Sequence, residues 1–355
     1  MSKLRFALVG CGSIARKHAH ALHHYLQEAE IGAFVDVDID RARKFSEEYG
    51  APAFANVAEM MRSMKDQIDV FSVLTPSGVH SQNVLDLVKY GRPMVVEKPL
   101  ALRLEDADRM LEACDQHGVK LFVVHQNRYN LPIAKAREAL EQGRFGRLVL
   151  GTIRLRWRRD QKYYDSESWR GTWAYDGGVF MNQAVHHIDM LTWFMGNVES
   201  VRSMAATRLV KIEAEDTGVA VIRFNSGALG VLEATTATRP KDLEGSISIL
   251  GEKGSVVIGG FFMNDLVTWN FEDKQPIDDV IFQQFGKNPP DLGYNLGEYL
   301  RGVVASIKTK KAALVDGLEG RKSLELITAI YESIESNADV QLRFRPTKCK
   351  QGVAS

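Results

Sequence analysis

The sequence predicts an α/β protein in which a doubly wound parallel sheet comes first. A C-terminal α+β domain built on a largely antiparallel open sheet follows it. Strand and helix patterns alternate over the first 125 residues, whereas short strands joined by tight turns fill positions 201–258. Alternation is typical of a parallel sheet covered by helices, and turn-linked strands favour antiparallel pairing. The length of 355 residues also suggests two domains.

The first predicted domain spans residues 1–125. Its apolar, strand-like runs are separated by segments with helical periodicity. The expected strands are 4–9, 31–35, 70–74, 94–97 and 120–124, and the expected helices are 14–28, 40–49 and 104–117. Two β-type runs linked by a helix pair in parallel, because a crossover returns the chain to the same edge of the sheet.

The second predicted domain spans residues 126–340 and carries the strands of a different sheet. We expect helices at 131–142, 183–194, 294–307 and 321–337, and strands at 148–158, 201–208, 217–225, 228–236, 246–250 and 255–258. The tail at 341–355 mixes Pro, Lys, Gln and Ser, which predicts poor order.

The composition excludes several classes of protein. Lys plus Arg and Asp plus Glu are equal at 45 each, so no net field attracts nucleic acid or a membrane surface. No apolar run approaches the roughly 20 residues of a membrane span. The chain runs directly into a strand pattern, so we expect no signal peptide, and its three cysteines are widely separated. These features favour a cytoplasmic protein.

A glycine-rich turn follows the first predicted strand and begins the first helix. It reads Gly10-Cys11-Gly12-Ser13-Ile14-Ala15. Small residues there allow a tight turn, and the helix N-terminus stabilises a pyrophosphate. Asp36 ends the second strand, about 20 residues further on, where a carboxylate binds ribose hydroxyls. We therefore predict a Rossmann site for NAD, contacted by Gly10, Gly12, Ser13, Ile14 and Asp36.

The choice between NAD and NADP depends on the residues around Asp36. Its carboxylate would repel the extra phosphate of NADP, and no arginine follows immediately. NAD is therefore the predicted cofactor, and Arg41 keeps the NADP alternative open.

Two loops at the carboxyl ends of later strands carry further polar groups. Thr75-Pro76-Ser77 with His80 follows the third strand, and Glu97-Lys98-Pro99 follows the fourth. Open α/β sheets bind ligands at that edge, so Lys98 is a candidate catalytic residue. The alternatives are a solvated loop lysine at position 98 and a helix-start role for His80.

Together these motifs resemble the glucose–fructose oxidoreductase/inositol dehydrogenase/MocA (Gfo/Idh/MocA) oxidoreductases over nearly the whole chain. The matching segments are 10–15, 75–80, 97–99, 127–128, 177–178, 182–189 and 317–326. The resemblance implies that Lys98 and His186 form the catalytic pair. It further implies that the cofactor site includes Thr75, Pro76, His80, Glu97, Lys98 and Asn127. Where the family commonly has Asp-x-Gly-x-His, this chain carries an amide, Asn182.

Longer segments are similar to one branch of the family, the bacterial UDP-N-acetyl-2-amino-2-deoxyglucuronate dehydrogenases. These segments are 156–164, 168–173, 176–183 and 288–294. The similarity implies NAD-dependent oxidation of the 3-hydroxyl of a UDP-N-acetylglucosaminuronate-type sugar nucleotide (UDP-GlcNAcA), on the route to surface-polysaccharide sugars. It also implies a homotetramer joined by the second domain's sheets and, as in some enzymes of this branch, reoxidation of NADH by 2-oxoglutarate.

Oxidising a secondary alcohol requires a base that removes the hydroxyl proton while a hydride leaves carbon. His186 suits this role because imidazole titrates near neutral pH, and Lys98 can stabilise the developing oxyanion. A desolvated lysine with a lowered pKa can exchange roles with the histidine, so the assignment stays open. Asn182 is expected to orient the sugar.

A substrate with a diphosphate and a carboxylate calls for cations near the cleft. The candidate substrate-binding residues are Arg156, Arg158, Lys162, Tyr164, Trp169, Asn182 and His186, with Tyr163, Arg170 and Arg239 beside them. For the arginines, the alternative is a cationic strand face that packs against a partner subunit. For the aromatic residues, it is a place in the core or in an interface.

The sequence leaves three other functions open as alternatives. An inositol or simple sugar can be the substrate, and an NAD-dependent glycoside hydrolase begins with the same 3-oxidation before elimination. A non-catalytic NAD-bound sensor would need neither Lys98 nor His186. The histidines at positions 20–24 and 186–187 have helical spacing, but they lack cysteines, so we predict no metal.

Overall fold

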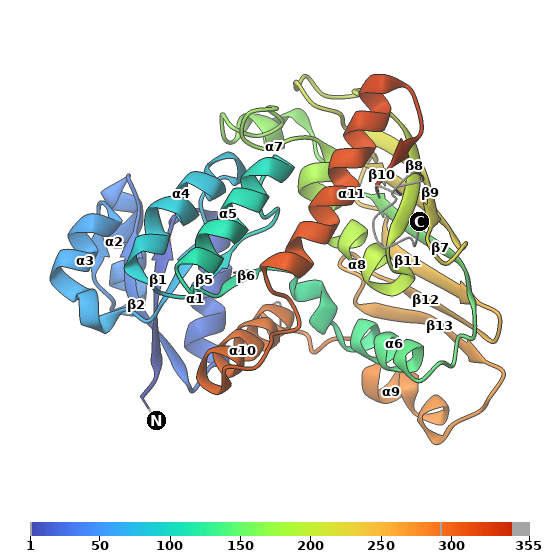
Figure 1. Cartoon of the computed structure of the whole chain (residues 1–355), viewed down its shortest axis with the longest axis horizontal. Coiled ribbons are helices and arrows are strands. Elements are labelled where there is room, and N and C mark those ends of the chain that lie inside the picture. The colour runs from blue at the N-terminus through green and yellow to red at the C-terminus, as the bar shows by residue number, and fades with distance from the viewer. Residues whose placement is uncertain (1, 292, 343–355) are drawn as a thin grey trace, which may run out of the picture.

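The computed structural model contains two β-sheets, each flanked by helices (Figure 1). It describes residues 2–291 and 293–342. The six-stranded sheet comes from the N-terminal part of the chain and the eight-stranded sheet from the C-terminal part. Most of the predicted tail at 341–355 lies outside the described residues, although Gln341 belongs to the short strand β14 (Val340–Gln341).

The first sheet is parallel throughout, as predicted. Its strands are β1 (Leu4–Val9), β2 (Ala29–Val35), β3 (Ala53–Phe54), β4 (Val70–Val73), β5 (Met94–Val96) and β6 (Leu121–Val123). Their order is β3-β2-β1-β4-β5-β6, so the winding direction reverses between β1 and β4. Doubly wound sheets bind ligands at that reversal. The strands β4, β5 and β6 are buried along their whole length, as strands covered on both faces must be.

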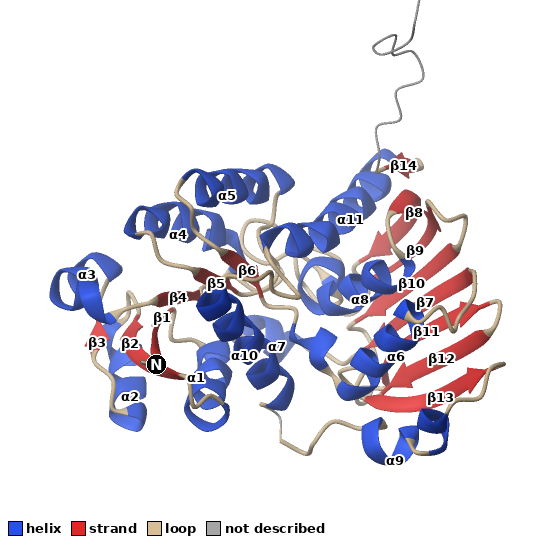
Figure 2. Cartoon of the chain, turned by 60° about the horizontal axis from the view of Figure 1, so that its bottom comes forward, coloured by secondary structure: helices blue, strands red, loops and turns tan. Residues whose placement is uncertain are grey.

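Helices cover both faces of this sheet. They are α1 (Ser13–Tyr25), α2 (Ile39–Tyr49), α3 (Val57–Met64), α4 (His80–Leu87), α5 (Leu104–Gln116), α10 (Tyr294–Thr309) and α11 (Gly317–Ser336). In Figure 2, α1, α2 and α10 lie below the sheet, and α4, α5 and α11 lie above it. Because α10 contacts α1, a helix of the predicted range 126–340 packs on the first sheet. The boundary at residues 125 and 126 stays a prediction.

The second sheet is antiparallel except at one pair, which agrees with the prediction of a largely antiparallel sheet. Its strands are β7 (Leu148–Arg156), β8 (Val198–Ala206), β9 (Thr217–Phe224), β10 (Leu229–Thr235), β11 (Glu244–Gly251), β12 (Gly254–Gly259), β13 (Asp265–Phe271) and β14. The order is β13-β12-β11-β7-β10-β9-β8-β14. The exception is the parallel pair of β7 and β10, which the long excursion between these strands makes possible.

One face of the second sheet is covered by helices and the other is open (Figure 2). The covering helices are α6 (Leu131–Glu141), α8 (Val185–Met195) and α11. Along β9, Ala220 and Ile222 are buried, whereas Val219 and Val221 are 48% and 59% exposed. Because side chains alternate between the two faces of a strand, Val219 and Val221 lie together on the open face and form an apolar row there.

The segment before α8 differs from the predicted helix 183–194. A short helix, α7 (Gln161–Asp165), comes first, and a π-helical turn (Val179–Gln183) leads into α8. Gly178 permits this turn, because a Cβ there would lie 2.0 Å from Oε2 of Glu215. The main-chain amide of Phe180 donates to Oε1 of Glu215 (3.1 Å). Such turns often occur at functional sites.

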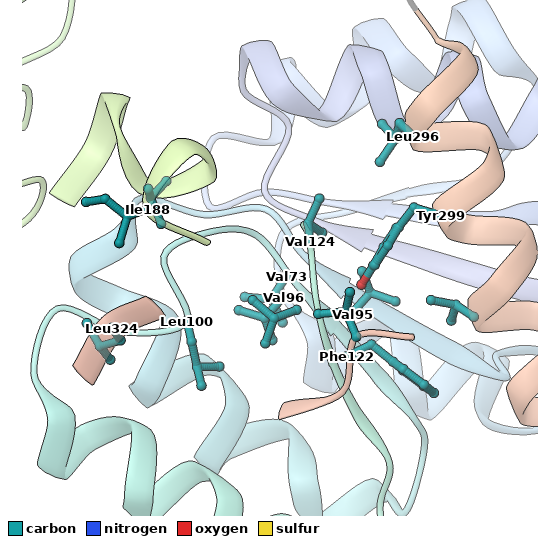
Figure 3. Close-up of a cluster of buried hydrophobic side chains, with 14 of the residues drawn as sticks. Val73, Val95, Val96, Leu100, Phe122, Val124, Ile188, Leu296, Tyr299 and Leu324 are labelled. Atoms are coloured by element: carbon teal, nitrogen blue, oxygen red, sulfur yellow. The ribbon is translucent and has the colours of Figure 1, made fainter. Parts of the chain in front are cut away.

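The two sheets share a buried core. Figure 3 shows Val73, Val95 and Val96 of the first sheet in one cluster with helical residues from later in the chain. Those helical residues are Ile188 of α8, Leu296 and Tyr299 of α10, and Leu324 of α11. The helix α11 contacts both α5 and β8, and Gly320 lets it approach β6 closely. This shared core fixes the second sheet beside the carboxyl edge of the first.

Candidate active site

A cavity of about 880 Å³ lies where the two halves of the chain meet. The first half contributes the turn after β1 and the ends of β2, β4 and β5. The second half contributes side chains from positions 157–186 and 261–262. A site between two domains at the switch point of a parallel sheet is the usual place for a dinucleotide and its reaction partner.

The glycine turn forms one end of this cavity. Gly10 has a φ of +98°, and a Cβ there would lie 2.8 Å from the carbonyl carbon of Leu74, so the turn requires glycine. Apart from its two chain neighbours, no described residue comes within 4 Å of the Cβ position of Gly12, which lines the cavity. The helix α1 begins at Ser13, so its free amides face this space. These features fit a pyrophosphate.

Asp36 is held in place at the end of β2. Its carboxylate accepts hydrogen bonds from the main-chain amides of Cys11 (2.7 Å) and Asp38 (2.9 Å), and it lines the cavity. Arg41 lines the cavity as well, and its Nε lies 3.3 Å from the Asp38 carboxylate. A fixed carboxylate at this position fits the ribose of NAD.

Glu97 and Lys98 lie at the carboxyl end of β5, as predicted from the sequence. A Glu97 oxygen lies 2.8 Å from Nε2 of His18, and the other accepts from the Lys98 amide. Burial would raise the pKa of Glu97, but the hydrogen bond and charge of His18 bring it below its usual value. Burial also lowers the pKa of Lys98, although the charges of Glu97 and Asp176 oppose this effect.

His186 lines the same cavity from the first turn of α8. Its ring meets that of His125 edge to face, with centroids 5.9 Å apart. Nδ1 of His186 is buried without a hydrogen-bond partner among residues 2–291 and 293–342. Burial lowers the pKa of His186 well below its usual value, and the charge of Lys98 acts in the same direction. The neutral imidazole is therefore the stable form.

Asn182 joins Lys98 to a carboxylate that sequence reasoning did not single out. Nζ of Lys98 donates to the main-chain oxygen of Asn182 (3.0 Å) and to its Oδ1 (3.4 Å). Nδ2 of Asn182 donates to Asp176, which is 2% exposed. Asp176 lies within the segment 176–183, but nothing in the sequence pattern indicates that its side chain points at position 182.

The other predicted substrate residues divide into two groups. Trp169 lines the cavity with Asn182 and His186, and so do Tyr163 and Arg170. Arg156 instead donates to Glu233 (2.6 Å) and Glu244 (3.2 Å). Arg158 pairs with Asp160, Tyr164 is buried with its hydroxyl 3.1 Å from that of Thr236, and Lys162 is exposed. None of these last four is among the described residues that line the cavity.

Of the predicted cofactor residues in the later loops, some line the cavity and others lie behind its wall. Thr75 and Pro76 line the cavity, and the Thr75 hydroxyl donates to Asn83 (2.6 Å). His80 is buried behind them, with its ring nitrogens 2.9 Å from the carbonyl oxygens of Pro99 and Thr75. Asn127 is also buried and accepts from Asn295 (3.3 Å). His80 and Asn127 thus support the loops around the cavity and do not line it.

A wall of cationic and aromatic side chains lines another part of the cavity. The guanidinium groups of Arg159 and Arg170 lie 5.2 and 4.3 Å from the ring centroid of Tyr163. The Tyr163 hydroxyl accepts from Arg170 (2.5 Å) and Gln183 (3.0 Å). Lys17 of α1 also lines the cavity. Sequence reasoning missed Arg159 because strand alternation selects 156 and 158, whereas β7 ends at 156.

The fold and this cavity define a dinucleotide-dependent oxidoreductase. Residues 4–125 match the oxidoreductase family's NAD-binding Rossmann fold, and residues 137–342 match the same family's C-terminal alpha/beta domain. The chain belongs to the Gfo/Idh/MocA oxidoreductase family. It is an NAD-dependent oxidoreductase, which confirms the predicted enzyme class and cofactor.

Two solved structures are similar over nearly the whole chain. The WlbA dehydrogenase from Bordetella pertussis, in complex with NADH and UDP-GlcNAcA, is 41% identical with a TM-score of 0.92, over 97% of this chain and 99% of that one. The WlbA dehydrogenase from Chromobacterium violaceum, in complex with the same two ligands, is 39% identical with a TM-score of 0.90, over 98% of each chain. A myo-inositol 2-dehydrogenase from Thermotoga maritima is 28% identical, over 96% of this chain and 98% of its own.

In the part of the chain that the structure describes, no helix is long and apolar enough to cross a membrane. Within the same residues, no group of three or more His, Cys, Asp or Glu side chains is arranged to hold a metal ion.

Proposed function

We propose that this protein oxidises the 3-hydroxyl of UDP-GlcNAcA, or of a closely similar sugar nucleotide, with NAD. One observation carries the proposal: a single cavity contains the NAD-type glycine turn, the pair Lys98 and His186, and a cationic wall. The 41% identity to a dehydrogenase solved with NADH and UDP-GlcNAcA supports the same substrate. The proposed place of action is the cytoplasm, in the synthesis of surface-polysaccharide sugars.

His186 is the proposed base. Its burial keeps the imidazole neutral, so that a ring nitrogen can accept the proton of the sugar hydroxyl. Lys98, held by Asn182, donates a hydrogen bond to the same oxygen and stabilises its developing charge. Gly10, Gly12 and Asp36 would hold NAD, which would supply the acceptor for the hydride from the carbinol carbon.

Arg159, Arg170 and Lys17 are the proposed anion-binding residues. All three line the cavity, and the two guanidinium groups lie over the Tyr163 ring, with Arg159 also 3.5 Å from the Asp242 carboxylate. Guanidinium groups bind phosphate and carboxylate oxygens in pairs, so a preformed pair suits a nucleoside diphosphate sugar acid. Trp169 and Tyr163 offer flat faces for a sugar or a base.

A spectrophotometric assay with the purified protein tests the proposal. With NAD, UDP-GlcNAcA should raise NADH absorbance, and mass spectrometry should detect a 3-keto sugar nucleotide and no free sugar. Adding 2-oxoglutarate should raise turnover if the protein also reoxidises its NADH. No reaction with UDP-GlcNAcA, together with turnover of myo-inositol, would favour the second candidate.

That second candidate is an inositol or simple-sugar dehydrogenase. It is favoured by the 28% identity to the Thermotoga maritima myo-inositol 2-dehydrogenase over nearly the whole chain. An uncharged polyol does not need two stacked arginines in its site, and for that reason we rank it second. The non-catalytic sensor is excluded, because the chain belongs to an oxidoreductase family and Lys98 and His186 share one cavity.

The open face of the second sheet supports the predicted homotetramer. Exposed apolar side chains on three adjacent strands form one patch, which we call the sheet patch: Met204, Val219, Val221, Leu229 and Val231. Contiguous apolar patches of this kind mark protein–protein contacts in soluble proteins. A second copy of this chain presents the same patch, so symmetric pairing through it is self-complementary.

A further inference from the structure

Asp176 occupies a fixed position behind the cavity wall. Its side chain is 2% exposed, and its main-chain amide donates to Thr172 (3.1 Å). Oδ2 accepts from the amide of Gly171 (2.7 Å), while Gly177 turns the chain away with a φ of +81°. The carboxylate is therefore oriented by the turn that carries it. It is not among the described residues that line the cavity, so it acts only through a neighbour.

The other oxygen of Asp176 determines which way the Asn182 amide points. Oδ1 of Asp176 accepts from Nδ2 of Asn182. An amide has one donor end and one acceptor end, and an ionised carboxylate can only accept. Oδ1 of Asn182 must therefore face away from Asp176, and it lies 3.4 Å from Nζ of Lys98. The reversed amide would bring two N–H donors against the lysine ammonium group.

We propose that Asp176 is a positioning residue of the dehydrogenase reaction, which holds Lys98 at the reacting hydroxyl through the Asn182 amide. The kinetic part of this inference rests on the proposed function. The structural part concerns only the contacts from Asp176 to Lys98 and holds for any substrate. Chains of hydrogen bonds that include a charge strengthen one another, so this relay also favours the charged lysine.

The charges around Lys98 show why a second carboxylate matters there. Glu97 precedes it, while Lys17 of α1 and Arg170 add positive charge; His186 faces it from α8. Burial lowers the pKa of Lys98, and Glu97 and Asp176 oppose that effect. A neutral residue at position 176 should therefore lower the pKa of Lys98 further. A carboxylate introduced at position 182 in the same variant should restore the Lys98 pKa.

The test uses three variants of the full-length chain. Asp176→Asn removes the carboxylate without changing its shape. The double variant Asp176→Asn/Asn182→Asp exchanges the two groups, so that the amide at 176 donates to the carboxylate at 182. Asp216→Asn is the matched control, since Asp216 is also buried but accepts from the amides of Arg208 and Leu209 instead.

Two readouts separate the inference from the proposed function. The pKa of Lys98 is measured without substrate, from the pH dependence of its labelling by fluorodinitrobenzene, followed by mass spectrometry of its peptide. Turnover of UDP-GlcNAcA and the Kd of NAD are measured in parallel. If the wild-type protein turns over no UDP-GlcNAcA, the proposed function fails, while the labelling still decides the role of Asp176.

We expect Asp176→Asn to lower the Lys98 pKa and to reduce kcat on the order of a hundredfold, with little change in the Kd of NAD. The exchanged double variant should regain the Lys98 pKa and most of kcat, and the Asp216→Asn control should keep the wild-type Lys98 pKa. An unchanged pKa in Asp176→Asn would overturn the inference. So would a double variant that folds but recovers neither property, because a merely structural carboxylate predicts that outcome.

Discussion

At the scale of single residues, the surroundings of Lys98 and His186 predict a bell-shaped pH profile. His186 must be neutral to accept a proton, and burial lowers its pKa below the usual 6.5. Lys98 must be charged to stabilise an oxyanion, and burial lowers its pKa below the usual 10.5. The acid limb of kcat/KM should therefore lie below pH 6.5 and the alkaline limb below pH 10.5. An acid limb well above pH 6.5 would rule out His186 as the base.

Arginines that line the cavity and arginines that pair with carboxylates away from it should respond differently to substitution. Arg170→Ala removes a cavity guanidinium and should raise the KM for the sugar nucleotide about tenfold to a hundredfold. Arg156→Ala, which breaks a pair with Glu233, should leave that KM unchanged. Steady-state kinetics of both variants checks this, with the Kd of NAD as a control for folding. The reverse ranking would support the substrate role that the sequence predicts for Arg156.

At the scale of elements, the π-helical turn rests on a carboxylate that titrates near neutral pH. Burial raises the pKa of Glu215 to about 7 from the usual 4.5, despite hydrogen bonds from Phe180 and Tyr331. The folded state thus holds this proton more tightly, so Glu215 weakens folding progressively between pH 4.5 and 7. The full cost, about 3 kcal/mol, applies above pH 7.

Glu215→Gln tests this account because glutamine has nearly the same shape and no charge. The free energy of unfolding of the variant, relative to that of the wild type, should rise by about 3 kcal/mol from pH 4.5 to above pH 7. Urea denaturation at several pH values measures the difference. A difference that does not change with pH would show that Glu215 keeps its usual pKa.

Elements with a clear period were predictable, and the irregular ones were not. The buried strands β4, β5 and β6 follow from short apolar runs, and β9 from its alternation. The two residues of β3 are too few to show a period. The π-helical turn depends on the contact between Gly178 and Glu215, which are 37 positions apart, so no local pattern could indicate it.

The same limit applies to the site. Lys98 and Asp36 were predictable because each ends a recognisable strand at a known edge of a sheet. Asp176 and Arg159 reach the site through loops, whose conformation depends on tertiary contacts that local sequence does not encode. The resemblance to a family supplied His186, which no spacing within the first domain could have paired with Lys98.

At the scale of the whole molecule, the sheet patch predicts the assembly. Val221→Glu places a charge in the middle of it and should convert the expected tetramer to smaller species, because burying an unpaired charge is costly. Leu318→Glu is the matched control, since Leu318 is similarly exposed but lies on α11. Size-exclusion chromatography with light scattering measures both masses. A Val221→Glu protein of unchanged mass would exclude the patch from the contact.

The central claim is that one cavity, built by both halves of the chain, brings an NAD site and the pair Lys98 and His186 to the 3-hydroxyl of a sugar nucleotide. Isotope transfer tests it most directly. UDP-GlcNAcA that carries deuterium on the carbon of the 3-hydroxyl is incubated with the protein and NAD, and the NADH is analysed by mass spectrometry. The account predicts deuterated NADH. Formation of unlabelled NADH would mean that another hydroxyl is oxidised and would contradict it.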